Sequence, residues 1–225
     1  PYDITSGSIL PGDEFVGSLT RVSGENIGSY EISQGDLDLN PNYNLTVHPG
    51  IFKIQAAAPT IDFDDITNDV ITKIYGDADF NVTASSDSGG TITYSIVDPD
   101  PANGTSIAGA TVTLGNAGTV RIKATVAANG NFAEGEKTIT LTIDKAVLQA
   151  KADDRTITYG DDIPADFTVS YTGWVNGDTK ADIDTEPIAF TFTEKGDNVA
   201  TRSILLNGTE ALDNNYTFIT EGELS

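Results

Sequence analysis

The sequence predicts an all-β protein built of tandem immunoglobulin-like β-sandwich domains in an elongated rod. Three observations support this fold class: short runs in which apolar and polar residues alternate, clusters of Gly, Asn, Asp and Pro between the runs, and motifs that recur at the spacing of a whole domain. A period of two places apolar side chains on one face of a sheet, and no stretch shows the spacing of an amphipathic helix. Many short strands separated by regular turns are typical of a sandwich.

Residues 138–145 show the alternation most clearly. Ile139, Leu141 and Ile143 alternate with Thr and Asp, so the three aliphatic side chains are expected to face one interior. β-Branched residues suit such a pleated, half-buried surface. Together with the preceding run, this region predicts a core of Ile122, Val126, Ile139, Leu141 and Ile143. Residues 51–56 resemble this run, and we interpret each of the two as the last strand of a module.

Recurring motifs divide the chain into modules. Tyr75-Gly76-Asp77 returns 84 residues later as Tyr159-Gly160-Asp161. Asparagine precedes an aromatic residue at three corresponding places, namely Asn42-Tyr43, Asn131-Phe132 and Asn215-Tyr216. This spacing indicates an array of whole domains. We predict that residues 1–57 are the C-terminal part of a module, 58–146 a complete module, and 147–225 a module that lacks its last strand.

Alternating runs place the expected strands in order. In the first module they predict strands at 18–22, 29–32, a run ending at residue 47, and 51–55. In the middle module they predict strands at 81–84, 91–97, 110–114, 119–126 and 137–143. Turn-forming residues such as those at 87–90 and 129–131 separate them. The third module begins directly after residue 146.

Composition restricts the possible functions. The formal net charge is −22, with 12 Lys and Arg against 34 Asp and Glu. Such a charge disfavours nucleic acids and anionic membrane surfaces as partners. The chain has no Cys and one His, so disulfides, thiolate metal sites and a histidine-based catalytic triad are not expected. It has no run of about 20 apolar residues, so we expect no membrane insertion. No catalytic signature is present, and we predict that the protein is not an enzyme.

Acidic clusters are the candidate metal ligands. Carboxylates and backbone carbonyls supply the six to eight oxygen ligands of Ca²⁺. The candidates lie just after the two predicted module boundaries, at Asp62, Asp64 and Asp65 and at Asp153 and Asp154. No twelve-residue EF-hand pattern occurs, so solvated loop charge is the alternative interpretation. Ca²⁺ is the one cofactor that the sequence leaves open.

Aromatic residues provide two further candidates. In the turns around Tyr75-Gly76-Asp77 and Tyr159-Gly160-Asp161, Gly permits a positive φ and Asp bonds nearby backbone N–H groups. We expect these turns to be structural and to lie near a domain junction. Tyr171 and Trp174, the only Trp, form the second candidate. They are expected to serve as a stacking platform for a sugar or to pack in a core or between domains.

Several of these motifs resemble the MBG domain of the Tyr-Gly-X type. In the third module the resemblance is carried by residues 159–161, 172–178 and 215–217, and in the first by residues 19–35, 42–43 and 52–54. The middle module shares only Tyr75-Gly76-Asp77 and the closing strand, and is similar to a divergent bacterial immunoglobulin-like domain. The resemblance implies tandem β-sandwich repeats in large secreted bacterial surface proteins, many of them adhesin-like. It implies no catalytic residues.

These observations favour a structural function. We expect a stalk or filament segment of a secreted bacterial cell-surface adhesin, outside the cell, which spaces a distal binding region from the cell surface. The alternative is a β-sandwich module that binds glycans, with or without Ca²⁺. The expected partners are neighbouring modules of the same long chain or a like chain joined end to end, and surface glycans in the alternative.

Overall fold

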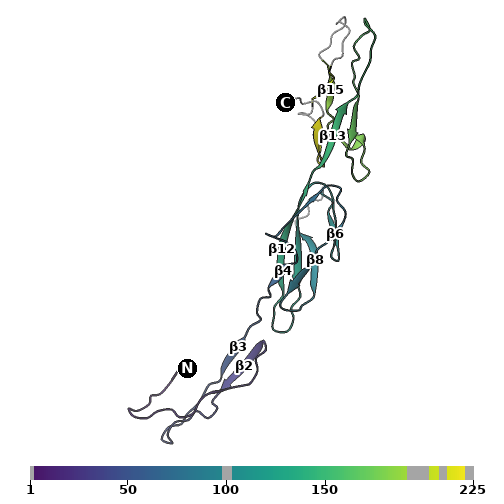
Figure 1. Ribbon diagram of the computed structural model, residues 1–225. Helices are drawn as coiled ribbons and strands as arrows, with labels where there is room; N and C mark the ends of the chain where they lie inside the picture. The colour runs from purple at the N-terminus through teal and green to yellow at the C-terminus, as the bar shows by residue number, and fades with distance from the viewer. Residues whose placement is uncertain (1–2, 98–102, 192–202, 208–211, 221–225) are drawn as a thin grey trace. The chain divides into compact units, whose positions relative to one another are not determined.

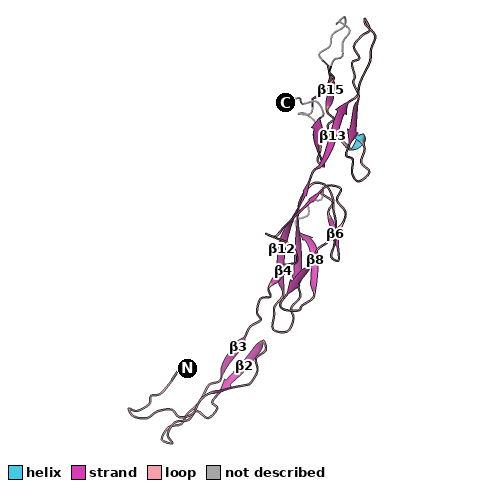
Figure 2. Cartoon of the chain, viewed as in Figure 1, coloured by secondary structure: helices cyan, strands magenta, loops and turns pink. Residues whose placement is uncertain are grey.

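The computed structural model describes residues 3–97, 103–191, 203–207 and 212–220. The described residues form β-strands, turns and a single short 3-10 turn, η1 (Lys180–Asp182), as Figure 2 shows. The predicted all-β fold is therefore confirmed. No helix in the described ranges has the length and apolar character that crossing a membrane requires.

The contacts divide the chain into two compact units. One unit consists of residues 1–60 with the loops 86–91 and 126–135. The other consists of residues 61–85, 92–125 and 136–225. The first module belongs to the first unit, whereas most of the middle module and the whole third module belong to the second.

The first module contains one small antiparallel sheet. Its strands are β1 (Thr20–Arg21), β2 (Gly28–Ser33) and β3 (Gly50–Ile54), in the order β1-β2-β3. Figure 1 shows β2 and β3 side by side. Tyr30 faces Phe52 across β2 and β3, and the Arg21 guanidinium lies over both rings, 5.3 and 4.9 Å from their centroids. Arg21 thus makes a cation–π contact with a ring on each of the two neighbouring strands.

The predicted strand ending at residue 47 is not a strand in the structure. Residues 44–49 belong to no ladder, although exposure alternates along residues 44–47 as it would in a strand. The corresponding stretch of the third module, β17 (Tyr216–Thr220), pairs with β13 (Ala146–Ala152). The first module has no described counterpart of β13, so the alternating run lacks a backbone partner.

The middle module is a sandwich of short sheets. A four-stranded sheet has the order β5-β12-β11-β8, a three-stranded sheet the order β6-β10-β9, and β4 pairs with β7. The bounds are β4 Ile61–Phe63, β5 Val70–Ile74, β6 Phe80–Asn81, β7 Ala84–Ser86, β8 Ile92–Val97, β9 Ser106–Ala108, β10 Thr111–Thr113, β11 Gly118–Val126 and β12 Gly135–Asp144. The predicted core is confirmed, because Ile122, Val126, Ile139, Leu141 and Ile143 are each at most 2% exposed.

The third module is built around β13. This strand pairs antiparallel with β14 (Val169–Thr172) and parallel with β17, so that it lies between them. A separate pair joins β15 (Ile188–Phe190) to β16 (Leu205–Asn207). Ala146, Leu148 and Ala150 of β13 are buried, as their period of two requires.

Candidate functional site

A tyrosine at the start of β17, Tyr216, is the centre of a network of side-chain contacts. Asp213 lies three residues before Tyr216, and its Oδ1 accepts hydrogen bonds from the backbone N–H groups of Asn215 and Tyr216, at 2.7 and 2.8 Å. This Asx-type turn fixes the entry into the strand. Tyr216 is 3% exposed, so its ring direction is determined by packing.

The hydroxyl of Tyr216 is held by the turn at residues 175–178. It donates to Asp178 Oδ2 at 2.8 Å and accepts from the Val175 N–H at 3.1 Å. Asn176 and Gly177 have φ values of 56° and 80°, and the Asp178 N–H donates to the Val175 carbonyl at 2.9 Å. Two successive positive φ values are typical of a type I′ turn, for which Asn-Gly is the preferred pair. We call this turn and Tyr216 the receiving site.

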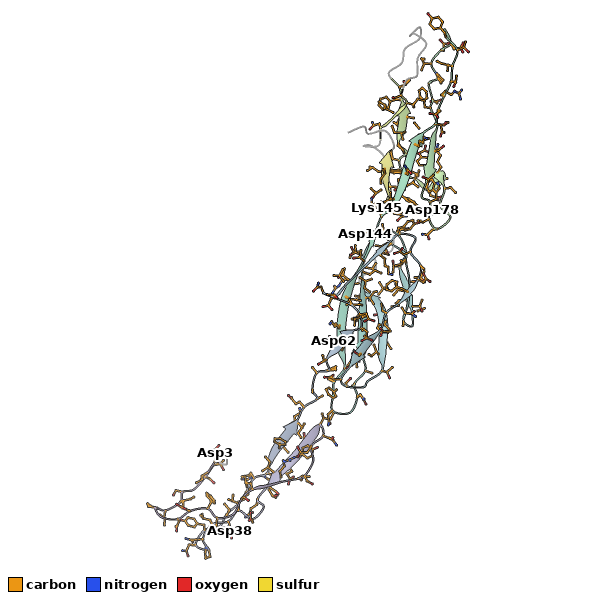
Figure 3. All side chains as sticks on the ribbon, viewed as in Figure 1. Asp3, Asp38, Asp62, Asp144, Lys145 and Asp178 are labelled. Carbon is orange, nitrogen blue, oxygen red and sulfur yellow. The ribbon has the colours of Figure 1, made fainter. Side chains whose placement is uncertain are left out.

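The Tyr75-Gly76-Asp77 turn of the middle module packs on the receiving site. The Tyr75 hydroxyl donates to Asp178 Oδ2 at 3.0 Å, and its ring meets the Tyr216 ring edge-on with centroids 5.6 Å apart. Tyr75 is only 8% exposed, and its N–H donates to the Asp144 carbonyl at 2.8 Å. Asp178 therefore accepts two tyrosine hydroxyls; Asp144 and Asp178 are labelled in Figure 3.

Gly76 lets the two modules approach. Its φ is 92°, and a Cβ added there would lie 2.5 Å from Val175 Cβ. The turn is closed locally, because the Asp77 N–H donates to the Ile74 carbonyl and the Ile74 N–H donates to Asp77 Oδ2, both at 2.9 Å. Gly is thus needed here both for the backbone conformation and for the close contact.

An asparagine forms a second contact between the same modules. Asn215 Oδ1 accepts from the Ala117 N–H at 2.9 Å, and its Nδ2 donates to Asn116 Oδ1 at 3.1 Å. The other compact unit repeats this contact between the first module and the loop at residues 126–135. There Asn131 Oδ1 accepts from the Ile27 N–H at 2.9 Å, and its Nδ2 donates to Asn26 Oδ1 at 3.1 Å. The sequence places Asn131 and Asn215 at corresponding positions of two modules, but it did not predict that either residue would join neighbouring modules.

One comparison with known protein families finds a match in two segments of the chain. The family model of the MBG domain (YGX type) matches residues 1–53 and 148–225, together more than half of the chain. The chain belongs to the MBG domain family. Membership indicates a module of a bacterial surface protein. No curated protein and no solved structure matches the chain significantly.

Trp174 and Tyr171 extend the aromatic cluster of the third, MBG-type module. The Trp174 ring lies between those of Tyr216 and Tyr171, with centroid distances of 5.6 Å to each. Both predicted sugar-stacking residues therefore pack in the same cluster as the receiving site. Burial raises the pKa values of Tyr75 and Tyr216, and the nearby Asp178 carboxylate adds to this effect. Both tyrosine hydroxyls therefore stay protonated at physiological pH.

The predicted calcium ligands are engaged with other groups or exposed. Lys137 Nζ lies 3.2 Å from Asp62 Oδ1 and 3.2 Å from Asp69 Oδ1. Asp64 accepts from the Ser85 hydroxyl, and Asp153 from the Ser170 hydroxyl. Asp65 and Asp154 are exposed. Within the described ranges, no three acidic or histidine side chains are grouped so that they could hold a metal ion.

The Tyr171 hydroxyl leads to a prediction about pH. This oxygen is buried and has no hydrogen-bond partner among the described residues. Burial, aided by the Glu186 carboxylate, raises the pKa of Tyr171 from 10.0 to about 12. Above pH 10 the unfolded chain loses this proton while the folded chain keeps it, so stability falls as the pH rises from 10 through 12.

Tyr171→Phe is therefore expected to keep or slightly raise the free energy of unfolding at pH 7, because an unpaired buried hydroxyl costs about 1–3 kcal/mol. The difference in free energy of unfolding between the variant and the unsubstituted chain should grow, in favour of the variant, between pH 10 and 12. Urea unfolding followed by the fluorescence of Trp174 would measure both effects. Tyr159→Phe, at a side chain that is 68% exposed, is the matched control. A loss of stability at pH 7 on Tyr171→Phe would show that the hydroxyl has a partner.

Proposed function

We propose that the chain is a structural segment of the stalk or filament of a secreted bacterial cell-surface adhesin. Its modules lie outside the cell and hold a distal binding region away from the surface. A stalk must transmit position from one module to the next, so the joints between modules have to resist bending. The observation that supports this proposal is the set of side-chain contacts at the junctions.

The junction between the middle and third modules uses both packing and directed hydrogen bonds. The rings of Tyr75 and Tyr216 pack against each other, and Asp178 Oδ2 accepts a hydrogen bond from each of the two hydroxyls. Hydrogen bonds to a charged acceptor contribute about 1.5–3 kcal/mol each, more than neutral ones. The Asn215 contact lies at a second point of the junction, and two separate contacts restrict rotation better than one.

Repetition of the asparagine contact supports a general role in joining modules. Asn131 binds Asn26 and Ile27 with the same atoms that Asn215 uses on Asn116 and Ala117. A contact used once could be incidental, whereas its use in both compact units indicates a feature of how these modules follow one another. Glycan binding is the less favoured function, because the rings of Tyr171 and Trp174 pack in the aromatic cluster.

The stiffness of the junction can be tested with a matched pair of glycine variants. Gly76 and Gly160 have the same φ of 92°, so Ala carries the same backbone strain at both, about 1–2 kcal/mol. Only at Gly76 would the new Cβ collide with Val175, since nothing lies within 4 Å at Gly160. Gly76→Ala is therefore expected to open the junction, whereas Gly160→Ala should leave it closed.

Single-molecule energy transfer would measure the result. The chain has no cysteine, so Val70→Cys in the middle module and Ile188→Cys in the third, 47% and 59% exposed, give a unique dye pair. We expect a narrow distance distribution for the parent chain and for Gly160→Ala, and a broad one for Gly76→Ala. A broad distribution in the parent chain would contradict a stiff junction and with it the stalk proposal.

A further inference from the structure

The third module carries a second Tyr-Gly-Asp turn with the geometry of the first. Gly160 has the φ of Gly76, 92°. The Asp161 N–H donates to the Thr158 carbonyl at 3.0 Å, and the Thr158 N–H donates to Asp161 Oδ2 at 3.1 Å, as in the turn at Gly76. The difference lies in the aromatic ring. Tyr75 is 8% exposed under the third module, whereas Tyr159 is 68% exposed.

The first module carries a second receiving site. The Tyr43 hydroxyl donates to Asp13 Oδ2 at 2.6 Å and accepts from the Leu10 N–H at 2.9 Å. Tyr216 makes the same pair of bonds with Asp178 and Val175. The Asp13 N–H closes the turn by donating to the Leu10 carbonyl at 3.1 Å, and Gly12 has a φ of 96°. Leu10, the counterpart of Val175, is 66% exposed.

We propose that the Tyr159-Gly160-Asp161 turn docks on the receiving site of the first module in a second copy of this chain, head to tail. The Tyr159 hydroxyl would donate to Asp13, and its ring would lie against Tyr43. Gly160 would lie against Leu10, as Gly76 lies against Val175 within the chain. The inference rests on the proposed function. It assumes that the exposed turn at Tyr159 and the exposed receiving site at Leu10 join two copies in the way that Tyr75 and Tyr216 join two modules of one chain.

Two features set the strength of this contact. The residue between Leu10 and Gly12 is Pro11, which fits position i+1 of a type II turn and has no side-chain amide. Its counterpart in the third module is Asn176, so the two turns differ in the side chain at this position. In addition, two chains of charge −22 repel each other. Association is therefore expected to strengthen with salt, because 1 M salt shortens the Debye length to about 3 Å.

Photo-crosslinking of the complete chain would test the contact. With p-benzoylphenylalanine at position 159, irradiation in 1 M NaCl is expected to give covalent dimers whose crosslinked peptide contains residues 8–13 or Tyr43. Position 188 is the control site, since Ile188 is 59% exposed in the same module. In the partner copy, Leu10→Glu should reduce dimer yield about tenfold or more, which corresponds to about 1.4 kcal/mol of binding.

Val16→Glu is the matched control for Leu10→Glu, because Val16 is an exposed apolar residue of the same module, at 62%. It should leave the dimer yield unchanged. Dimers no more frequent than from position 188, crosslinks that map elsewhere, or crosslinks within one chain would overturn the inference. The energy-transfer experiment on Gly76→Ala reports on the junction inside the chain. If the unsubstituted chain gives a narrow distance distribution but no crosslinked dimers, the contact between copies is rejected. The proposed function as a stalk segment is then still supported.

Discussion

Leu141→Ala is expected to lower the free energy of unfolding of the middle module by about 2–5 kcal/mol. Leu141 is fully buried in β12, between Ile139 and Ile143 on the same face. It also lies opposite Ile71 in the parallel ladder with β5. Truncation removes apolar burial and leaves a cavity that the flanking strands cannot fill, because β12 is held on both sides by β5 and β11.

Hydrogen exchange of the amides in β11 and β12 under increasing urea would measure this loss, since core strands exchange by global unfolding. Thr142→Ala is the matched control, one residue further along β12 on the opposite face, where burial is partial. It should change stability by well under half the effect of Leu141→Ala. A loss below about 1 kcal/mol for Leu141→Ala would mean that Leu141 does not face the core of the middle module.

Tyr216→Ala is expected to cost the third module about 3–5 kcal/mol, the range seen for large buried aromatic residues. Tyr216 is 3% exposed and contacts the rings of both Tyr75 and Trp174. Its loss also leaves the Val175 N–H and the Asp178 carboxylate without this partner. The variant should therefore both destabilise the third module and release Tyr75 from the junction.

Trp174 fluorescence reports the unfolding of the third module, because it is the only Trp in the chain. Tyr216→Phe is the control that separates the ring from the hydroxyl. It keeps the packing with Tyr75 and Trp174, and we expect a loss of about 1–3 kcal/mol from the missing hydrogen bonds. Equal losses for Phe and Ala would show that the ring contributes nothing, contrary to its burial.

Part of the fold could be predicted because its cause is local. The alternation of Ile139, Leu141 and Ile143 is a property of neighbouring residues, and it correctly assigned the face of β12 that is buried. The short strands β4, β5 and β9 were not predicted. β5, for example, pairs in parallel with β12, which lies about 70 residues further along the chain. The sequence of residues 70–74 does not indicate that partner.

The predicted strand that ends at residue 47 was wrong because pairing, and not the local pattern, is missing. Its residues alternate as in a strand, yet a strand needs a backbone partner, and the described first module offers none. The same type of run in the third module becomes β17 because β13 lies beside it. Sequence pattern thus indicates which segments can form strands, whereas pairing decides which of them do.

The sequence by itself determined the all-β class, the core of the middle module and the recurrence of the Tyr-Gly-Asp and Asn-aromatic motifs. Each of these follows from residue type and short-range spacing. Only the tertiary structure decided what the motifs do. The turns at Tyr75 and Tyr159 have the same φ at Gly and the same internal hydrogen bonds, yet one tyrosine is buried and the other exposed. The physical reason is that burial depends on whether a receiving site, about 100 residues away, lies against the turn, and such a contact leaves no trace in the local sequence.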